Sequence, residues 1–153
     1  ASLSGHLVLS TLHTNTAVGA ITRLRDMGIE PFLLSSSLVG VLSQRLVRNL
    51  CTHCREIYTA DAAECKVLNV TEAEIYRPVG CSHCKQTGYQ GRMGLYELIL
   101  INDQVRSMIN DEVAEMDIEK VLREQSRPLQ ESGYKAVLDG RTSLQEVLRV
   151  TQI

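Results

Sequence analysis

Cys51-Thr-His-Cys54 and Cys81-Ser-His-Cys84 are two short motifs in which a pair of cysteines encloses two residues. The Cys-x-x-Cys spacing lets two thiolates bind one metal ion, at a Zn–S distance of about 2.3 Å. The 26 residues between the motifs make a loop longer than the usual zinc-ribbon loop of about 15–20 residues. Because closure entropy grows slowly with length, the two motifs still predict one four-thiolate zinc site.

Two disulfides, or four unrelated buried cysteines, are the alternative interpretations. A disulfide within Cys-x-x-Cys is usually redox-active rather than structural, which favours the metal. Four protein ligands leave no open coordination position, so the site is predicted to be structural rather than catalytic. His53 and His83 lie inside the motifs and are expected to point away from the metal. Cys65 has no spaced partner and is expected to be a free thiol in the intervening loop.

Composition excludes several classes of protein. The 153 residues carry a net charge of −2, whereas a dedicated nucleic-acid binder is normally strongly basic. The longest uncharged stretch, residues 31–44, is too short and too rich in serine to span a bilayer. Thiolate ligands together with an unpaired cysteine suit a reducing compartment. The chain starts without methionine and soon enters an apolar segment, so we expect a fragment of a larger protein.

The segment before the cysteines predicts a strand followed by two helices. Residues 7–12 read Leu-Val-Leu-Ser-Thr-Leu, which is typical of a strand covered on both faces in a parallel sheet. Apolar residues at helical spacing predict a helix over 16–27, with Thr14 or Asn15 as its N-cap. Pro31 predicts the start of a second helix that runs to about residue 49.

The segment after the cysteines predicts one strand and several helices. A capping box at 71–74 predicts a short helix between the two motifs. The apolar run 93–101 predicts a strand that rejoins the sheet of residues 7–12. Further helices are predicted over 103–110, 114–125, 129–138 and 144–150.

Several of these segments resemble one family of ATPases. Residues 4–15, Ser-Gly-His-Leu-Val-Leu-Ser-Thr-Leu-His-Thr-Asn, are similar to the histidine box of the secretion ATPases that drive type II secretion and assemble type IV pili. Further similar segments are 23–28, 43–47, the four cysteines, 88–97 and 139–148. The resemblance covers essentially the whole chain in order. It is closest to the type II secretion members, which carry this tetracysteine module.

The resemblance implies an α/β fold that contains the C-terminal portion of a RecA-like ATPase core with an incomplete sheet. It implies that residues 1–50 are the distal part of this core, with the histidine-box strand and two helices. Residues 51–90 would be the tetracysteine zinc module, and 91–102 a strand that returns to the core. Residues 103–153 would then form a small C-terminal helical subdomain.

The resemblance also assigns roles to individual side chains. His13 would lie near the γ-phosphate of ATP, where a neutral imidazole orients water or senses the phosphate. Thr11, Thr14 and Asn15 would support it by hydrogen bonds, and Arg92 would contact the nucleotide. His6, a strand length away, is expected to be structural or interfacial. From residue types alone, Thr14 and Asn15 are equally ordinary helix caps and His13 an ordinary loop histidine.

The function implied for the parent protein is ATP hydrolysis that powers type II protein secretion. The parent would be a hexamer that uses ATP and Mg²⁺ in the bacterial cytoplasm, peripheral to the inner membrane and bound to its secretion platform proteins. It would drive pseudopilus assembly and protein export, with no nucleic acid and no direct membrane insertion. The tetracysteine site would hold structural Zn²⁺.

The chain departs from the family in one respect. It contains no G-x-x-x-x-G-K-[ST] motif, so we expect the P-loop upstream of Ala1 and no ATPase activity in this fragment alone. The alternative interpretation is a non-enzymatic zinc-binding interaction module that binds protein or nucleic acid. The near-neutral charge and the few aromatic residues argue against the nucleic-acid version.

Overall fold

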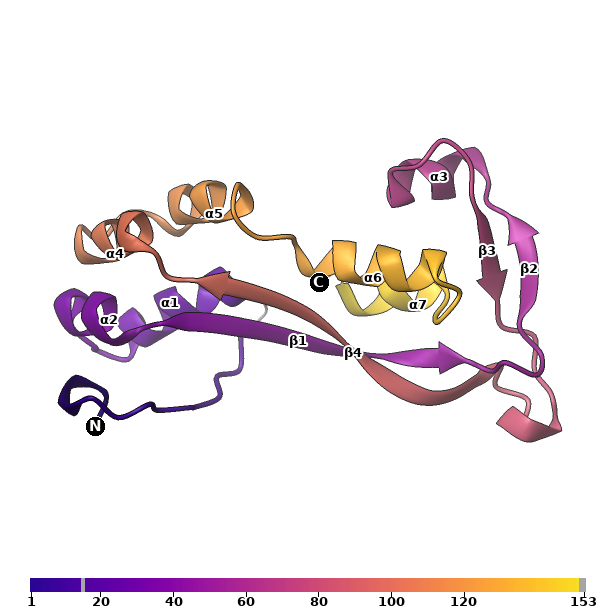
Figure 1. Cartoon of the computed structure of the whole chain (residues 1–153), viewed down its shortest axis with the longest axis horizontal. Helices are drawn as coiled ribbons and strands as arrows, with labels where there is room; N and C mark the ends of the chain where they lie inside the picture. Colours follow the sequence, from indigo (N-terminus) through magenta and orange to yellow (C-terminus); the bar gives the residue numbers. More distant parts are fainter. Residues whose placement is uncertain (15, 152–153) are drawn as a thin grey trace. The chain divides into compact units, whose positions relative to one another are not determined.

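The computed structural model describes residues 1–14 and 16–151. The two ends of the chain and its helices and strands are shown in Figure 1. In chain order the elements are η1 (Ser2–Ser4), α1 (Ala17–Asp26), α2 (Pro31–Ser37), β1 (Gly40–Leu50), β2 (Glu56–Thr59), α3 (Ala62–Leu68), β3 (Glu74–Arg77), η2 (Ser82–Cys84), β4 (Tyr89–Leu100), α4 (Asp103–Asn110), α5 (Glu115–Arg123), α6 (Leu129–Leu138) and α7 (Leu144–Thr151). None of the helices in the described part of the chain has the length and apolar character needed to cross a membrane.

Contacts within the chain group the residues into two compact units. The first unit comprises Ala1–Ser43 and Glu97–Arg127, and the second comprises Gln44–Tyr96 and Pro128–Ile153. Strands β1 and β4 pair with each other in a two-stranded sheet, and their arrows run in opposite directions in Figure 1. Each of the two strands contributes residues to both units.

The first unit contains α1, α2, α4 and α5, the short helix η1, and the adjoining ends of β1 and β4. Helix α1 begins where the Thr16 side chain accepts a hydrogen bond from the Gly19 N–H at 2.9 Å. The predicted caps differ from this one, since Thr14 precedes the cap and Asn15 lies outside the described residues. Apolar side chains of α1, α2, β4, α4, α5 and the link between β4 and α4 form the core: Ala17, Val18, Ile21, Leu34, Ile99, Ile101, Val105, Ile109, Ile118 and Leu122.

The second unit contains the β2–β3 hairpin together with α3, α6 and α7. Strands β2 and β3 are antiparallel, in a register that pairs Glu56 with Arg77 and Thr59 with Glu74. Helix α3 lies between these strands in the sequence, and α6 packs against α7. The buried core consists of Val47, Ala60, Cys65, Leu68, Ile75, Leu95, Leu129, Ala136, Val137, Leu144 and Val147.

The strand predicted at residues 7–12 is wrong, because these residues form no regular element. The side chains of Leu7 and Leu9 are 81% and 88% exposed. A strand exists only when its backbone N–H and C=O groups pair with a neighbouring strand. The strand predicted at 93–101 does form, as β4, but its partner is β1 rather than residues 7–12.

The second predicted helix ends twelve residues early, at Ser37 rather than at about residue 49. The hydroxyl groups of Ser36 and Ser37 donate to the backbone carbonyls four residues earlier, at 2.8 and 2.6 Å. Such bonds compete with the helix ladder and favour helix ends. The apolar residues that follow belong to β1, where pairing with β4 overrides their helical spacing.

The helix predicted at 71–74 is also wrong, since β3 begins at Glu74. The helix in this region is α3, which lies earlier in the sequence and ends at Leu68, before the predicted capping box begins. It opens with a capping box, in which Asp61 accepts from the N–H of Glu64 and the Glu64 carboxylate accepts from the N–H of Asp61. The predicted helices at 103–110 and 129–138 are confirmed as α4 and α6, and those near 114–125 and 144–150 are confirmed with small shifts at their ends.

Glu146 is the most deeply buried carboxylate of the second unit, with a side chain that is 0% exposed. Its oxygens accept hydrogen bonds from the guanidinium groups of Arg48 and Arg149, each at 2.7 Å, and from the Arg48 backbone N–H at 3.1 Å. Burial alone would raise the pKa of Glu146, but these donors outweigh it and lower the pKa to about 2. The ion pair between Arg48 and Glu146 joins β1 to α7.

We expect Glu146→Gln to lower the free energy of unfolding by about 2 kcal/mol at neutral pH, because hydrogen bonds to a charged group are lost. The folded pKa of about 2 lies below the unfolded value. The carboxylate therefore contributes fully above about pH 4.5, and its contribution disappears as the pH falls toward 2. Urea unfolding across this range measures the difference.

The exposed Glu72 provides the control, and Glu72→Gln should leave the free energy of unfolding unchanged. The difference in unfolding free energy between wild type and Glu146→Gln should shrink toward pH 2. A difference that stays constant from pH 7 to about pH 2 would show that it does not come from the charge of the Glu146 carboxylate.

Candidate metal centre

The first cysteine pair lies in the turn that follows β1. The Cys51 N–H donates to the Gly88 carbonyl at 2.9 Å, which holds the turn against the start of β4. The Cys51 carbonyl accepts hydrogen bonds from the N–H groups of Cys54 at 3.3 Å and Arg55 at 2.9 Å. The chain therefore turns back on itself, and both thiol groups face the same side.

The second pair repeats this geometry in and around η2. The Cys81 carbonyl accepts from the N–H groups of Cys84 at 3.3 Å and Gln86 at 2.9 Å. Lys85 and Gln86 have positive φ angles of 52° and 63°, as the tight turn after the second cysteine requires. Two turns of the same kind therefore converge from segments far apart in the sequence.

The four sulfur atoms form a compact group in which all lie within 4.8 Å of one another. The Sγ–Sγ distances are 3.9 Å between Cys51 and Cys81, 3.8 Å between Cys54 and Cys84, and 3.8 Å between Cys81 and Cys84. A tetrahedron with arms of about 2.3 Å has edges of roughly 3.8 Å, so the sulfur atoms fit a tetrahedral thiolate site. No two of them are joined, since all five cysteines of the chain are free thiols, which excludes the disulfide alternative.

Backbone N–H groups stabilise negative charge on the sulfurs. Burial opposes ionisation of Cys84, but the N–H groups of Cys81 and Gly88, at 3.2 and 3.1 Å from its Sγ, lower its pKa to about 6. Burial raises the pKa of Cys54 to about 11, although the Gly80 N–H donates to its Sγ at 3.3 Å. The Cys84 thiolate therefore forms more readily than the Cys54 thiolate, and a bound cation would stabilise negative charge on these sulfurs further.

Gly88 is a site residue that the cysteine spacing did not reveal. Its φ is +75°, and a Cβ atom there would lie 2.4 Å from Cβ of Pro78. Only glycine can bring this N–H so close to the Cys84 sulfur. The Thr87-Gly88 pair just after the second motif was the available sequence signal.

The two histidines of the motifs do not belong to the sulfur group. His53 and His83 are exposed and stack on each other, with ring centroids 4.1 Å apart and an interplanar angle of 14°. Cys65, which was predicted in a loop, is buried in α3, and its thiol donates to the Ala60 carbonyl at 3.7 Å. The Cys65 side chain packs in the core of the second unit.

The predicted histidine-box residues lie in the segment without regular structure before α1. His13 and Thr11 are exposed, and the His13 side chain makes no hydrogen bond with the described part of the chain. The Thr14 hydroxyl donates to the Thr16 carbonyl at 3.0 Å, and Asn15 lies outside the described residues. The structure therefore does not gather these side chains into a site.

The remaining predicted residues are also at the surface. His6 is exposed, with Nδ1 3.1 Å from the Ser4 hydroxyl oxygen. Arg92 is exposed on β4 and makes no side-chain hydrogen bond or ion pair with the described residues. Their roles stay predictions.

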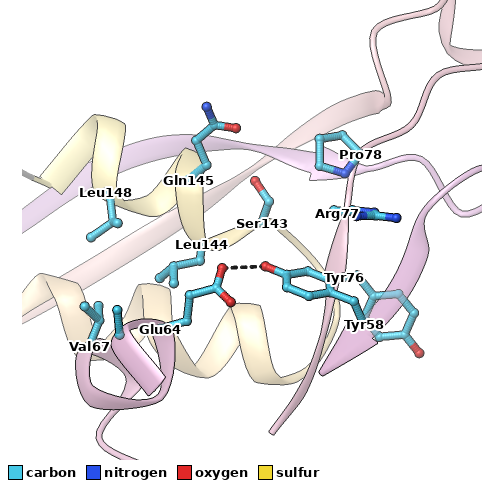
Figure 2. Close-up of a pocket in the computed structure, with 11 residues that line it drawn as sticks. Tyr58, Glu64, Val67, Tyr76, Arg77, Pro78, Ser143, Leu144, Gln145 and Leu148 are labelled. Carbon is cyan, nitrogen blue, oxygen red and sulfur yellow. Dashed lines mark hydrogen bonds between the residues drawn. The ribbon is translucent and has the colours of Figure 1, made fainter. Parts of the chain in front are cut away.

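The second unit contains a hollow of about 410 Å³, and Figure 2 shows the residues that line it. Mostly apolar and aromatic side chains of β2, α3, β3 and α7 line it, and Tyr58 donates a hydrogen bond to Glu64 at 2.6 Å. Burial and this carboxylate raise the pKa of Tyr58 further above its ordinary value. The phenol stays protonated at neutral pH, so the hollow offers a surface for packing rather than a reactive group.

Comparison with known proteins places the chain in a family. A family model described as "Type II/IV secretion system protein" matches residues 1–149. The chain belongs to this family. It is 55% identical over 155 residues to type II secretion system protein E of Pseudomonas aeruginosa, a match that covers 99% of the chain and 31% of the relative. Its identity to type II secretion system ATPase E of Vibrio cholerae is 53%, with the same coverage.

This member of the secretion family therefore spans about a third of the length of those relatives. Its fold is similar to that of the pilus retraction motor PilT in a crystal structure with bound ADP, with a TM-score of 0.60 and 23% identity. That likeness covers 96% of this chain and 33% of the motor. It confirms the predicted α/β fold class.

We expect this secretion-family chain to bind one metal ion, and Cys81→Ser to abolish stoichiometric binding, because three thiolates leave the tetrahedron incomplete. Metal content by mass spectrometry measures the effect. Cys65→Ser is the matched control, since Cys65 lies outside the sulfur group. Less than about half an equivalent of metal in the wild type would contradict the assignment.

Proposed function

We propose that this chain is part of a hexameric ATPase that powers type II protein secretion. The main support is the 53% identity to a type II secretion system ATPase E, which extends over 99% of the chain. In this proposal the longer protein hydrolyses ATP and couples the reaction to pseudopilus assembly and export of proteins. It works in the bacterial cytoplasm, peripheral to the inner membrane and bound to the secretion platform proteins.

The metal in this proposal is a structural Zn²⁺ held by Cys51, Cys54, Cys81 and Cys84. Zinc suits four thiolates in tetrahedral geometry, and Sγ–Sγ distances of 3.8–3.9 Å match that geometry. All four positions are taken by protein, so the ion has no open site for substrate. Its role is to fix the turn after β1 beside the turn before β4, which supplies folding energy to a small unit.

The nucleotide site requires more than this chain contains. Phosphoryl transfer needs backbone N–H groups and a lysine around the phosphates, and a hydroxyl and a carboxylate around Mg²⁺. The chain has no P-loop motif, so its residues by themselves do not form a site for ATP and Mg²⁺. We propose that His13, with Thr11, Thr14 and Asn15, contributes to the γ-phosphate end of the site in the longer protein. His6 has a structural or interfacial role, and Arg92 contacts nucleotide.

We expect His13→Ala in the longer protein to lower kcat much more than it weakens ATP binding, because the role proposed for His13 concerns the γ-phosphate during the reaction. Steady-state phosphate release and nucleotide-binding titrations separate the two effects. His6→Ala is the control and should change turnover less. Equal turnover in wild type and His13→Ala would contradict the proposed role and would mean that His13 is an ordinary loop histidine.

We expect the isolated chain to release no phosphate from ATP above background, because the phosphate cradle is missing from its sequence. The assay compares this chain with the longer ATPase under identical conditions. Turnover by the isolated chain at a rate near that of the longer protein would place the catalytic groups within residues 1–153, contrary to the proposal.

A further inference from the structure

The four cysteines of the metal centre differ in their access to solvent. Cys51 and Cys84 are buried, at 0% and 5% exposed, whereas Cys54 and Cys81 are half-buried. Each of the two turns therefore presents one cysteine to solvent and keeps the other inside. A soluble oxidant can reach a half-buried sulfur, and accessible thiols beside a second thiol are the ones that oxidise first.

The sulfur contacts pair each accessible thiol with a buried one across the two turns. Cys54 Sγ lies 3.8 Å from Cys84 Sγ, and Cys81 Sγ lies 3.9 Å from Cys51 Sγ. These two contacts use each of the four sulfurs once. A disulfide needs an S–S distance of about 2.05 Å, so the sulfurs of each pair have to approach by less than about 2 Å.

Four cysteines allow three ways of pairing, and the contacts distinguish them. Pairing within each motif has one of its two contacts in place, because Cys81 Sγ lies 3.8 Å from Cys84 Sγ. No sulfur–sulfur hydrogen bond joins Cys51 to Cys54 in the described residues. The same is true of Cys51 with Cys84 and of Cys54 with Cys81. The geometry therefore favours the set that joins Cys51 to Cys81 and Cys54 to Cys84.

Cys65, the fifth thiol of the chain, provides an internal reference. It is buried, and its thiol donates to the Ala60 carbonyl at 3.7 Å. It lies outside the sulfur group, so no neighbouring thiol is placed to form a disulfide with it. An oxidant that acts selectively on the sulfur group leaves Cys65 reduced.

We propose that the cysteine group is a site of reversible oxidation, in which a peroxide converts the four thiolates into the disulfides Cys51–Cys81 and Cys54–Cys84 and the metal is released. In each pair the half-buried thiolate attacks one oxygen of hydrogen peroxide and becomes a sulfenic acid, and the other oxygen leaves as hydroxide. The buried thiolate then attacks the sulfenic sulfur, so that the S–S bond forms and a second hydroxide leaves. Each disulfide therefore takes two electrons from two thiolates and reduces one peroxide molecule.

The inference rests on the zinc centre proposed above and adds a redox response to it. Each disulfide between the turns joins residues 30 positions apart. Such a bond keeps the base of the loop that contains β2, α3 and β3 closed without a metal. Disulfides within the motifs would leave the two turns unjoined. A dithiol reductant reverses the reaction and regenerates the thiols for metal binding.

The test is treatment of the metal-loaded chain with a modest excess of hydrogen peroxide. Tandem mass spectrometry of the unreduced digest is expected to show Cys51–Cys81 and Cys54–Cys84, with Cys65 still reduced. A chromogenic chelator is expected to capture about one equivalent of zinc, and dithiothreitol followed by zinc should restore the starting species. Cys84→Ser removes the buried partner of Cys54, so dimedone should trap a sulfenic acid at Cys54 in that variant. Cys65→Ser is the matched control and should give the wild-type products.

The outcomes separate this proposal from its rivals and from the zinc assignment. Thiols that stay reduced, disulfides within the motifs, or oxidation of Cys65 as fast as that of Cys54 would overturn the proposal. A chain that binds no metal would contradict the zinc assignment, whereas the disulfide map of its thiol form would still decide the redox proposal. In circular dichroism melting, the oxidised metal-free chain should have a Tm about 10 °C above that of the reduced metal-free chain. Equal Tm values would show that the disulfides do not hold the two turns together.

Discussion

Electrostatic repulsion among four thiolates is the constraint on which the second unit depends. Sulfur atoms 3.8–3.9 Å apart cannot all be ionised without a cation between them. The backbone N–H groups of Cys81 and Gly88 lower the pKa of Cys84 to about 6, whereas burial raises the pKa of Cys54 to about 11. A metal ion bound by the four cysteines would supply the remaining stabilisation and close a loop that contains β2, α3 and β3. The hairpin and its helix are thus tied at their base to the ends of β1 and β4.

The C-terminal helices are joined to the same base by a different interaction. Glu146 of α7 is buried and binds Arg48, three residues before Cys51. The Arg48 guanidinium also lies 4.1 Å from the centroid of the Tyr89 ring, and the Tyr89 hydroxyl is 2.7 Å from that of Ser143. A buried carboxylate with these partners is costly to disrupt. Two features therefore hold the end of β1 in place. One is the cysteine group that begins with Cys51, and the other is the ion pair between Arg48 and Glu146.

The parts of the fold that local chemistry determines could be predicted from the sequence. Helix α4 begins after an Asn102 cap and α6 begins after Pro128, both have helical periodicity, and both match the predicted ranges. Strand β1 could not be predicted in this way, because its residues are apolar at spacings that also suit a helix. Its pairing with β4, some forty residues or more along the chain, decides the outcome. Residues 7–12 show the converse, since apolar β-forming residues do not form a strand without a partner.

The same distinction applies to the cysteine group and to the hollow of about 310 Å³ beside the first cysteine turn. The four cysteines lie in two motifs whose internal spacing predicts a shared metal, so their convergence across 26 residues was predictable. Arg55 and Arg141 carry no such spacing, and only the folded chain brings them to one hollow. The hydrogen bond from Leu50 to the Arg141 carbonyl produces that approach, and its donor is the residue just before Cys51. The cysteine turn also forms part of the wall of that hollow, through Thr52 and Arg55.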